Sequence, residues 1–381
     1  MVFITLRFML NYLVLFLFAI SIVGCVEIEN RPNFKDWQKE NLSQSLIGLE
    51  PRLDSLVVKS DILNIDTIYR SMTGPYSSFT LVDLSDIKEK VIWLTGYQCK
   101  VFDAKNDQQI LDDYLCHNNL NYGEPDSYPW DIKTLGSEKR IFTLTAGQTR
   151  ITLPTGTGIP IYTPNNLAFF SQALNHNTFP INMDTYQEIT IFFYSNKHAP
   201  NEMKALYPQT PFVTTQIGGP EGGFNSPTSD LYSPVLICGI DSNSSCHISY
   251  PPNAKYNPYA DDYGRTYTGH WKLSKNDEVW TTNITNMLNL TENAIAMAAG
   301  SHMHPYAEKL ELWDLSKNQK LHELGASNYQ NKIGLSTIEY TSKLNISLKK
   351  NHQYALRSYY NCSDSTTGHT GMANMCLYIQ E

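Results

Sequence analysis

Short runs of alternating apolar and polar residues most constrain what this chain can fold into. The clearest run is Lys309-Leu-Glu-Leu-Trp313, and a period of two places residues i and i+2 on the same face of a β-strand. Further strand-like runs occupy residues 78–82, 90–97, 140–145, 150–153, 188–194, 234–240, 270–273, 294–304, 344–348, 354–360 and 375–379. Clusters of Gly, Pro and Asn separate these runs, as in sandwiches and jelly rolls. The sequence therefore predicts an all-β fold.

The length of the chain predicts two domains. Its 381 residues exceed what one hydrophobic core usually organises. Residues 195–215 carry crowded Asn, Lys, His, Pro and Gln without periodicity, so we place the boundary there. We expect two antiparallel jelly-roll (β-sandwich) domains in tandem, at residues 61–200 and 210–381, and short helices only, at residues 41–49 and 200–206.

The first 25 residues have the pattern of a lipoprotein signal peptide. Arg7 precedes an apolar run at residues 8–23, and the segment ends in Ile22-Val-Gly-Cys25. The run is shorter than the ~20 apolar residues that a membrane-spanning helix needs, which disfavours an uncleaved transmembrane segment. We expect lipidation of Cys25, extracytoplasmic location in a bacterial cell envelope, and anchoring to the membrane with residues 26–60 as a tether.

Two histidines lie just before the clearest alternating run. His302 and His304 are two residues apart on a predicted strand, so their imidazoles project from one face, as two ligands of one metal need. Taken alone, the pair is better explained as two polar residues on the solvent-exposed face of an antiparallel sheet. The C-terminal segment adds the thioether of Met375, and thioether and imidazole together form a soft ligand set suited to copper.

The histidine strand, the late Met375-Cys376 pair and the upstream Cys362 together resemble the copper type II, ascorbate-dependent monooxygenases. These are the peptidylglycine hydroxylating and dopamine β-monooxygenases, and the resemblance covers about residues 66–381. It implies a pair of jelly rolls. It also implies that His302, His304 and Met375 hold one oxygen-binding copper and that Cys362 pairs with Cys376.

The first domain departs from the pattern of that family. There, a second copper is bound by two adjacent histidines and by a third on a later strand before a tyrosine. Here the adjacent pair corresponds to Cys116-His117, and the later strand offers Phe192 and Phe193. One imidazole does not hold copper without other donors, so we expect one copper per chain and a structural or surface role for His117. Gly300 stands where peptide-amidating members carry an arginine, which argues against a C-terminal peptide substrate.

The cysteine count agrees with an extracytoplasmic protein. Seven cysteines less the lipidated Cys25 leave an even set of six, as expected for three disulfides. Six cysteines allow many connectivities, and our choice rests on proximity in the sequence and on the resemblance. We expect the disulfides Cys99–Cys116, Cys238–Cys246 and Cys362–Cys376.

Two functions of different classes follow. The first is a copper-dependent, monooxygenase-like envelope lipoprotein that hydroxylates a small molecule or peptide, with electrons from an external reductant such as ascorbate. The second is a non-catalytic copper-binding or interaction lipoprotein that keeps the fold. His369 is a weaker candidate for a residue that supports the ligands, and we expect His270 to accompany a packed Trp271. A net charge of −8 gives no basic surface for nucleic acid.

Overall fold

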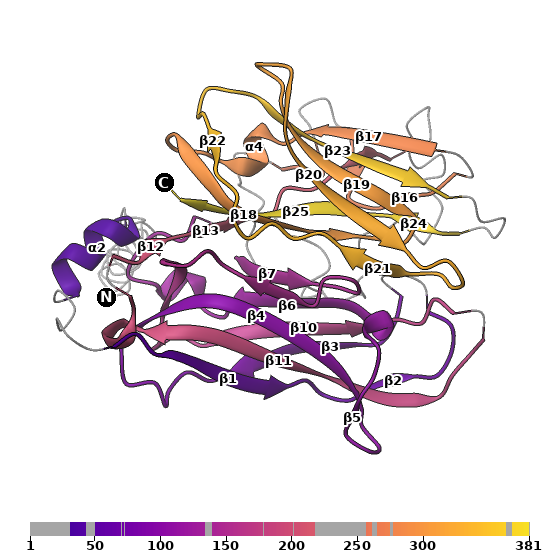
Figure 1. Cartoon of the computed structure of the whole chain (residues 1–381), viewed down its shortest axis with the longest axis horizontal. Coiled ribbons are helices and arrows are strands. Elements are labelled where there is room, and N and C mark those ends of the chain that lie inside the picture. The colour runs from indigo at the N-terminus through magenta and orange to yellow at the C-terminus, as the bar shows by residue number, and fades with distance from the viewer. Residues whose placement is uncertain are drawn as a thin grey trace, which may run out of the picture.

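The structure is a computed structural model, and most of the chain beyond residue 30 can be described. The described residues are 31–42, 50–69, 71, 73–133, 139–177, 179–200, 202–217, 257–260, 265–274, 277–362 and 368–380. Strands dominate them, so the predicted all-β class is confirmed. Each half of the chain forms a sandwich of two mainly antiparallel sheets, and the two sandwiches pack against each other (Figure 1).

The first sandwich contains one α-helix and twelve strands among the described residues. They are α2 (Phe34–Asn41), β1 (Leu53–Lys59), β2 (Leu63–Ile65), β3 (Tyr76–Val82), β4 (Val91–Asp103), β5 (Gln108–Gln109), β6 (Leu115–Tyr122), β7 (Arg140–Leu144), β8 (Arg150–Thr152), β9 (Thr157–Tyr162), β10 (Leu167–Ala173), β11 (Met183–Ser195) and β12 (Lys204–Ala205). The larger sheet has the order β1-β11-β4-β9-β12, with β2, β5 and β8 beside it. The smaller sheet has the order β3-β10-β6-β7.

The second sandwich begins with β13, the strand that follows β12 in the chain. Among the described residues its elements are β13 (Tyr207–Gln209), β14 (Thr215–Gln216), β15 (Tyr267–Thr268), β16 (Trp271–Lys272), β17 (Asp277–Asn283), α4 (Thr285–Leu288), β18 (Ala294–Met303), β19 (Ala307–Asp314), β20 (Gln319–Asn328), β21 (Leu335–Ile338), β22 (Ile346–Leu348), β23 (Tyr354–Asn361), β24 (Thr370–Gly371) and β25 (Ala373–Gln380). One sheet has the order β13-β25-β18-β22 and the other β17-β23-β19-β20-β21, while β14 pairs with β15 and β16 with β24.

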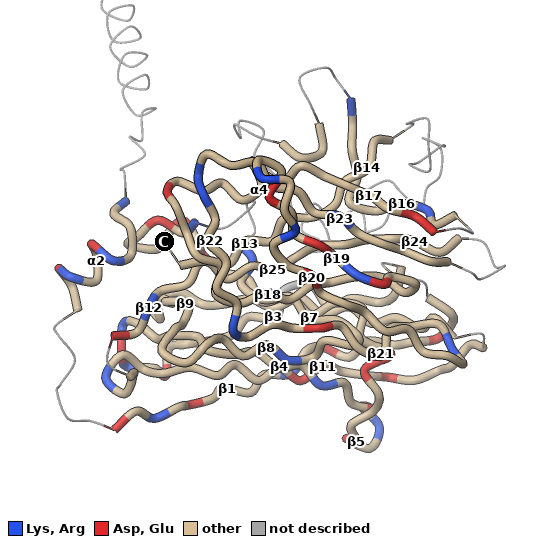
Figure 2. The backbone as a smooth tube through the Cα atoms, turned by 45° about the horizontal axis from the view of Figure 1, so that its top comes forward, with Lys and Arg blue, Asp and Glu red and all other residues tan. Residues whose placement is uncertain are grey.

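The sheet that contains β18 and β25 is buried on both faces. Met375 and Leu377 of β25 pack into the core of the second sandwich, whereas Cys376 and Tyr378 pack into the core of the first. Such a strand carries apolar residues on both faces, and every residue of β25 except the last is buried. Figure 2 shows no Lys, Arg, Asp or Glu along β18 or β25, so this layer joins the two domains through uncharged surface.

Several expectations about the N-terminal part and the helices need correction. Residues 26–60 are not only a tether, because α2 inserts Phe34 between the indoles of Trp93 and Trp130. The helix α2 was not predicted, and it ends at Asn41, where the helix predicted at residues 41–49 begins; residues 43–49 lie outside the described part. The helix predicted at residues 200–206 is replaced by the short strand β12, which pairs with β9 in parallel.

Two of the three predicted disulfides are also corrected. The sulfurs of Cys99, Cys116, Cys362 and Cys376 are all buried thiols, so neither Cys99–Cys116 nor Cys362–Cys376 is formed. The partners of each pair pack in different apolar clusters: Cys99 and Cys376 lie in the first core, Cys362 in the second, and Cys116 in a small cluster with Phe170. Cys25 and the pair Cys238–Cys246 lie outside the described residues. No helix within the described ranges is long and apolar enough to cross a membrane.

Candidate metal centre

The predicted histidine pair lies at the contact between the domains, with His302 on β18 and His304 just after its last residue. His302 and His304 are each 2% exposed, and their ring centroids lie 5.4 Å apart. The strand is regular from Ala298 onward, where its pairing with β25 follows a single register. The prediction that the two imidazoles share one face of a strand therefore agrees with their placement.

The same register separates Met375 from these histidines. His302 pairs with Asn374, whereas Met375 pairs with Ser301. Residues directly opposite in an antiparallel pair share a face, so Met375 projects from the face opposite His302. It is fully buried in the core of the second sandwich together with Met303. The structure thus corrects the predicted His-His-Met set, because it does not bring the Met375 thioether to the imidazoles.

A third histidine, His117 of β6 in the first domain, lies beside this pair. Its ring stacks on that of His302, with centroids 4.1 Å apart and planes inclined by 22°. One ligand atom each of His117, His302 and His304 lies within 4.8 Å of the others. We expected a structural or surface role for His117; its burial, with 1% exposure, excludes the surface role, and its place beside His302 makes it a candidate ligand. The structure buries all eight residues of β6 although half of them are polar, which no pattern in the sequence predicted.

Burial keeps these imidazoles neutral. Loss of hydration lowers the pKa of His117, His302 and His304 well below the usual value, and neighbouring imidazoles lower each pKa further. A neutral imidazole has one ring nitrogen with an available lone pair, which is the form that binds a metal.

Hydrogen bonding determines which nitrogen of His304 is available. Its Nδ1 lies 3.0 Å from the carbonyl oxygen of Thr370 and 3.1 Å from Thr370 Oγ1. Nδ1–H therefore donates to the carbonyl, and Nε2 is left as the acceptor. Among the described residues, neither His304 Nε2 nor either ring nitrogen of His302 has a hydrogen-bond partner. Buried polar atoms without partners are costly, and a bound cation would satisfy their lone pairs.

The space beside the imidazoles is small. A mostly apolar cavity of about 20 Å³ is lined by His302 of β18 and His304 just after it, by Leu115 and Cys116 from β6, and by Leu174 and His176 after β10. A volume of this size holds one water-sized molecule. An organic substrate does not fit there without rearrangement of the surrounding strands.

Gly300, where the resemblance to the copper monooxygenases led us to look for an arginine, lies in a tight contact. A Cβ on Gly300 would lie 2.8 Å from Gln148 Nε2 and 3.2 Å from the ring of Tyr340. Gln148 comes from the first domain, and its Oε1 accepts a hydrogen bond from Ser301 N at 3.1 Å. Close contact between the domains therefore occupies the volume that an arginine side chain would need.

Comparisons with known proteins do not supply a family. No family model matches the chain, and no curated protein matches it. A structure of Broad bean stain virus is 9% identical and has a TM-score of 0.33, with 94% of each chain covered. PNGase F, a glycosylasparaginase from Flavobacterium meningosepticum, is 10% identical with a TM-score of 0.32, and 86% of this chain and 96% of that chain are covered. Likenesses this low support no inference about function.

Proposed function

We propose that the chain is a metal-binding protein that holds one copper or zinc ion through His117, His302 and His304, between its two domains. The observation that carries this proposal is the convergence of three buried imidazoles whose ligand atoms lie within 4.8 Å of one another. Imidazole is a common ligand of both metals, and three histidines with a fourth, open position form a known type of centre.

The chain's own residues prepare such a site. Burial keeps the imidazoles neutral, so no proton must leave before binding. The carbonyl of Thr370 fixes the orientation of the His304 ring, and ring stacking on His117 restricts His302. Copper was expected partly because of a thioether ligand. Without Met375 in the set, three imidazoles suit zinc as well, so metal analysis must decide between them.

Oxygen activation of the monooxygenase type is the second candidate. The cavity of about 20 Å³ beside His302 and His304 favours it, because a molecule of the size of dioxygen fits there. We rank it below metal binding alone, since the same cavity does not admit an organic substrate. An external reductant such as ascorbate, and uptake of oxygen by the copper-loaded protein, belong to this second candidate.

The metal content of the purified chain tests the main proposal. After dialysis against copper or zinc and removal of excess, elemental analysis should give one ion per chain. His302→Ala and His117→Ala should each abolish retention, because each leaves only two imidazoles. Met375→Leu is the matched control and should retain the ion, since this swap conserves volume in an apolar core. Wild-type protein that retains no metal, or loss of metal from Met375→Leu alone, would contradict the three-histidine site.

Attachment to a membrane through an acylated Cys25 remains a separate proposal. It is supported by the apolar run at residues 8–23 and by the segment Ile22-Val-Gly-Cys25. The intact mass of the protein isolated from cell envelopes should equal that of a chain beginning at Cys25 plus its acyl groups. A mass that still includes residues 1–24 would exclude this processing.

A further inference from the structure

Two more histidines, one from each domain, lie outward from the three-histidine centre. His176 follows strand β10 of the first sandwich, and His369 precedes β24 of the second. Both line a second cavity of about 10 Å³, together with Ser71, Pro305, Tyr306 and Thr370. The two domains therefore contribute one imidazole each to the walls of a single small space.

Specific contacts hold both outer imidazoles. Ser71 Oγ lies 3.0 Å from His176 Nε2. The hydroxyl of Tyr306 lies 3.4 Å from His369 Nε2, and the two rings meet edge to face with centroids 4.8 Å apart. Tyr306 has a φ of +72°, a left-handed conformation that is unfavourable for a bulky residue. Asn328 stabilises this turn, because its Oδ1 accepts from Tyr306 N at 2.7 Å.

The outer cavity adjoins the inner one. Ser71, His176 and Pro305 line both, and the inner cavity is also lined by His302 and His304. Thr370 forms a second connection, since it lines the outer cavity and accepts the hydrogen bond from His304 Nδ1. Exposure rises outward from 2% at His304 to 8% at His369, and His176 is half-buried. The imidazoles thus form a series that runs from the molecular surface to the buried centre.

We propose that His176 and His369 form an entry site, through which a copper or zinc ion reaches the buried centre of His117, His302 and His304. This inference rests on the proposed metal-binding function. A hydrated ion cannot enter a cavity that holds one water-sized molecule unless protein donors replace its water. In each exchange, one imidazole nitrogen replaces one water on the ion. The oxidation state of the ion therefore stays unchanged, and no reductant is needed.

An entry site affects rates rather than equilibrium. We would measure transfer of Zn²⁺ to the metal-free chain from its complex with a chromophoric chelator, and the reverse transfer to excess EDTA. His176→Gln/His369→Gln should slow both by about tenfold, the lower end of what residues around a metal site contribute. The dissociation constant and the stoichiometry of one ion per chain should stay unchanged. Copper(II) should show the same behaviour if the route serves either metal.

Two further variants sharpen the experiment. His352→Gln is the matched control. His352 lies shortly before the first residue of β23, and the last residue of that strand, Asn361, is the one near the entry site, because its N–H donates to Tyr306 O. Eight residues of strand place His352 about 25 Å from the entry site, so its loading rate should equal that of the wild type. Ser71→Leu fills the space shared by the cavities without removing a histidine, and it should slow loading as well.

Unchanged rates in a correctly folded double variant would overturn the entry site, whatever Ser71→Leu does. Weaker equilibrium binding with an unchanged loading rate would make an outer histidine a ligand instead. Misfolding of the double variant, detected by circular dichroism, would leave Ser71→Leu to decide. Failure of the proposed function is distinct from these results, because the wild-type chain would then bind no metal at all.

Discussion

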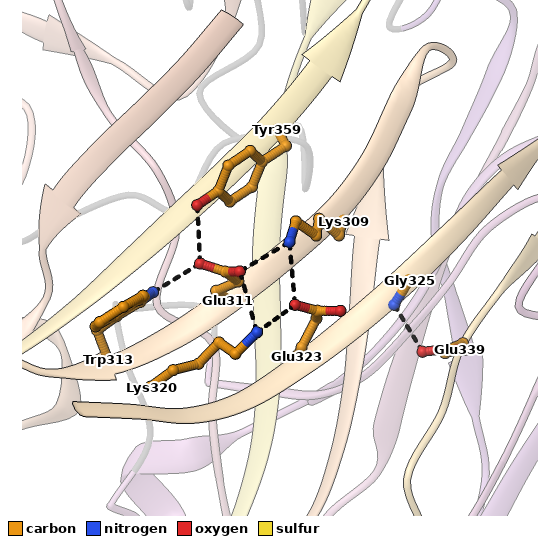
Figure 3. Close-up of polar contacts among 8 residues, drawn as sticks. All are labelled: Lys309, Glu311, Trp313, Lys320, Glu323, Gly325, Glu339 and Tyr359. Carbon is orange, nitrogen blue, oxygen red and sulfur yellow. Dashed lines mark hydrogen bonds and ion pairs between the residues drawn. The ribbon is translucent and has the colours of Figure 1, made fainter.

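At the scale of single residues, the second sandwich contains a buried carboxylate, that of Glu311, which is paired with a lysine. Glu311 of β19 is 3% exposed, and its carboxylate accepts hydrogen bonds from Lys309 Nζ at 3.0 Å, Trp313 Nε1 at 2.8 Å and the Tyr359 hydroxyl at 3.0 Å (Figure 3). Burial alone raises the pKa of this carboxyl, but these donors outweigh it and lower the pKa to about 2. The imidazoles of the candidate metal centre differ, because burial keeps them neutral instead of pairing their charge.

This depressed pKa predicts a dependence of stability on acid. The ordinary glutamate pKa is about 4.3 in the unfolded chain, so the contribution of Glu311 is full above that pH and is lost as the pH falls toward 2. Glu311→Gln should lower the free energy of unfolding at neutral pH by on the order of 2 kcal/mol and flatten its fall below pH about 4.5. Urea unfolding followed by tryptophan fluorescence measures both.

Glu308→Gln provides the control for this prediction. Glu308 lies on the same strand but is exposed, so its loss should change the unfolding free energy by less than about 0.5 kcal/mol. Equal acid sensitivity of the wild type and Glu311→Gln would show that the cluster in Figure 3 does not carry the effect.

At the scale of elements, strand β18 positions His302 and also contains Gly300, where the first domain leaves no space for a side chain. Gly300→Arg should destabilise the chain by more than about 3 kcal/mol, because a charged side chain would enter the space held by Gln148 and Tyr340. Ile295→Arg, at a partly exposed position of the same strand, should have little effect. Thermal unfolding of both variants measures the difference. A Gly300→Arg protein as stable as the wild type would refute the close contact between the domains.

The cysteines of β4, β6 and β25, together with Cys362, yield a second prediction at this scale. Unfolded without reductant, the chain should expose thiols at Cys99, Cys116, Cys362 and Cys376, because packing in separate clusters keeps the predicted partners apart. Alkylation followed by peptide mapping identifies each modified sulfur. Recovery of a Cys362–Cys376 cross-linked peptide would show instead that β25 and the segment after β23 approach more closely than described.

The elements also show how much of the site could be predicted from the sequence. Period-two alternation predicts β18 as a strand and places His302 and His304 on one face, because strand geometry is local. It does not determine the register between β18 and β25, and a shift by one residue decides whether Met375 faces the imidazoles or the opposite core. The position of His117 depends on packing between domains, which no local pattern encodes.

At the scale of the whole molecule, the two sandwiches behave as parts of one structure. Ala298, Cys376 and Tyr378 of the second sandwich pack within the core of the first. Hydrogen bonds also cross the boundary: Gln209 Nε2 donates to Lys133 O at 2.7 Å, and the Tyr340 hydroxyl donates to Thr152 O at 2.8 Å. Because His117 comes from the first domain and the other two histidines from the second, a bound ion would join the domains at the same contact.

This arrangement predicts that metal binding stabilises both domains together. At a free metal concentration about 100 times the dissociation constant, the folded state should gain roughly 2.7 kcal/mol, seen as a higher melting temperature in calorimetry and a single transition for the chain. EDTA should reverse the gain. His117→Ala should remove it, because the second domain alone then offers only His302 and His304. Met375→Leu should keep it, since Met375 lies in the opposite core. If metal raised the melting temperature of His117→Ala as much as that of the wild type, the ion would be bound within one domain, and the centre described between the domains would be excluded.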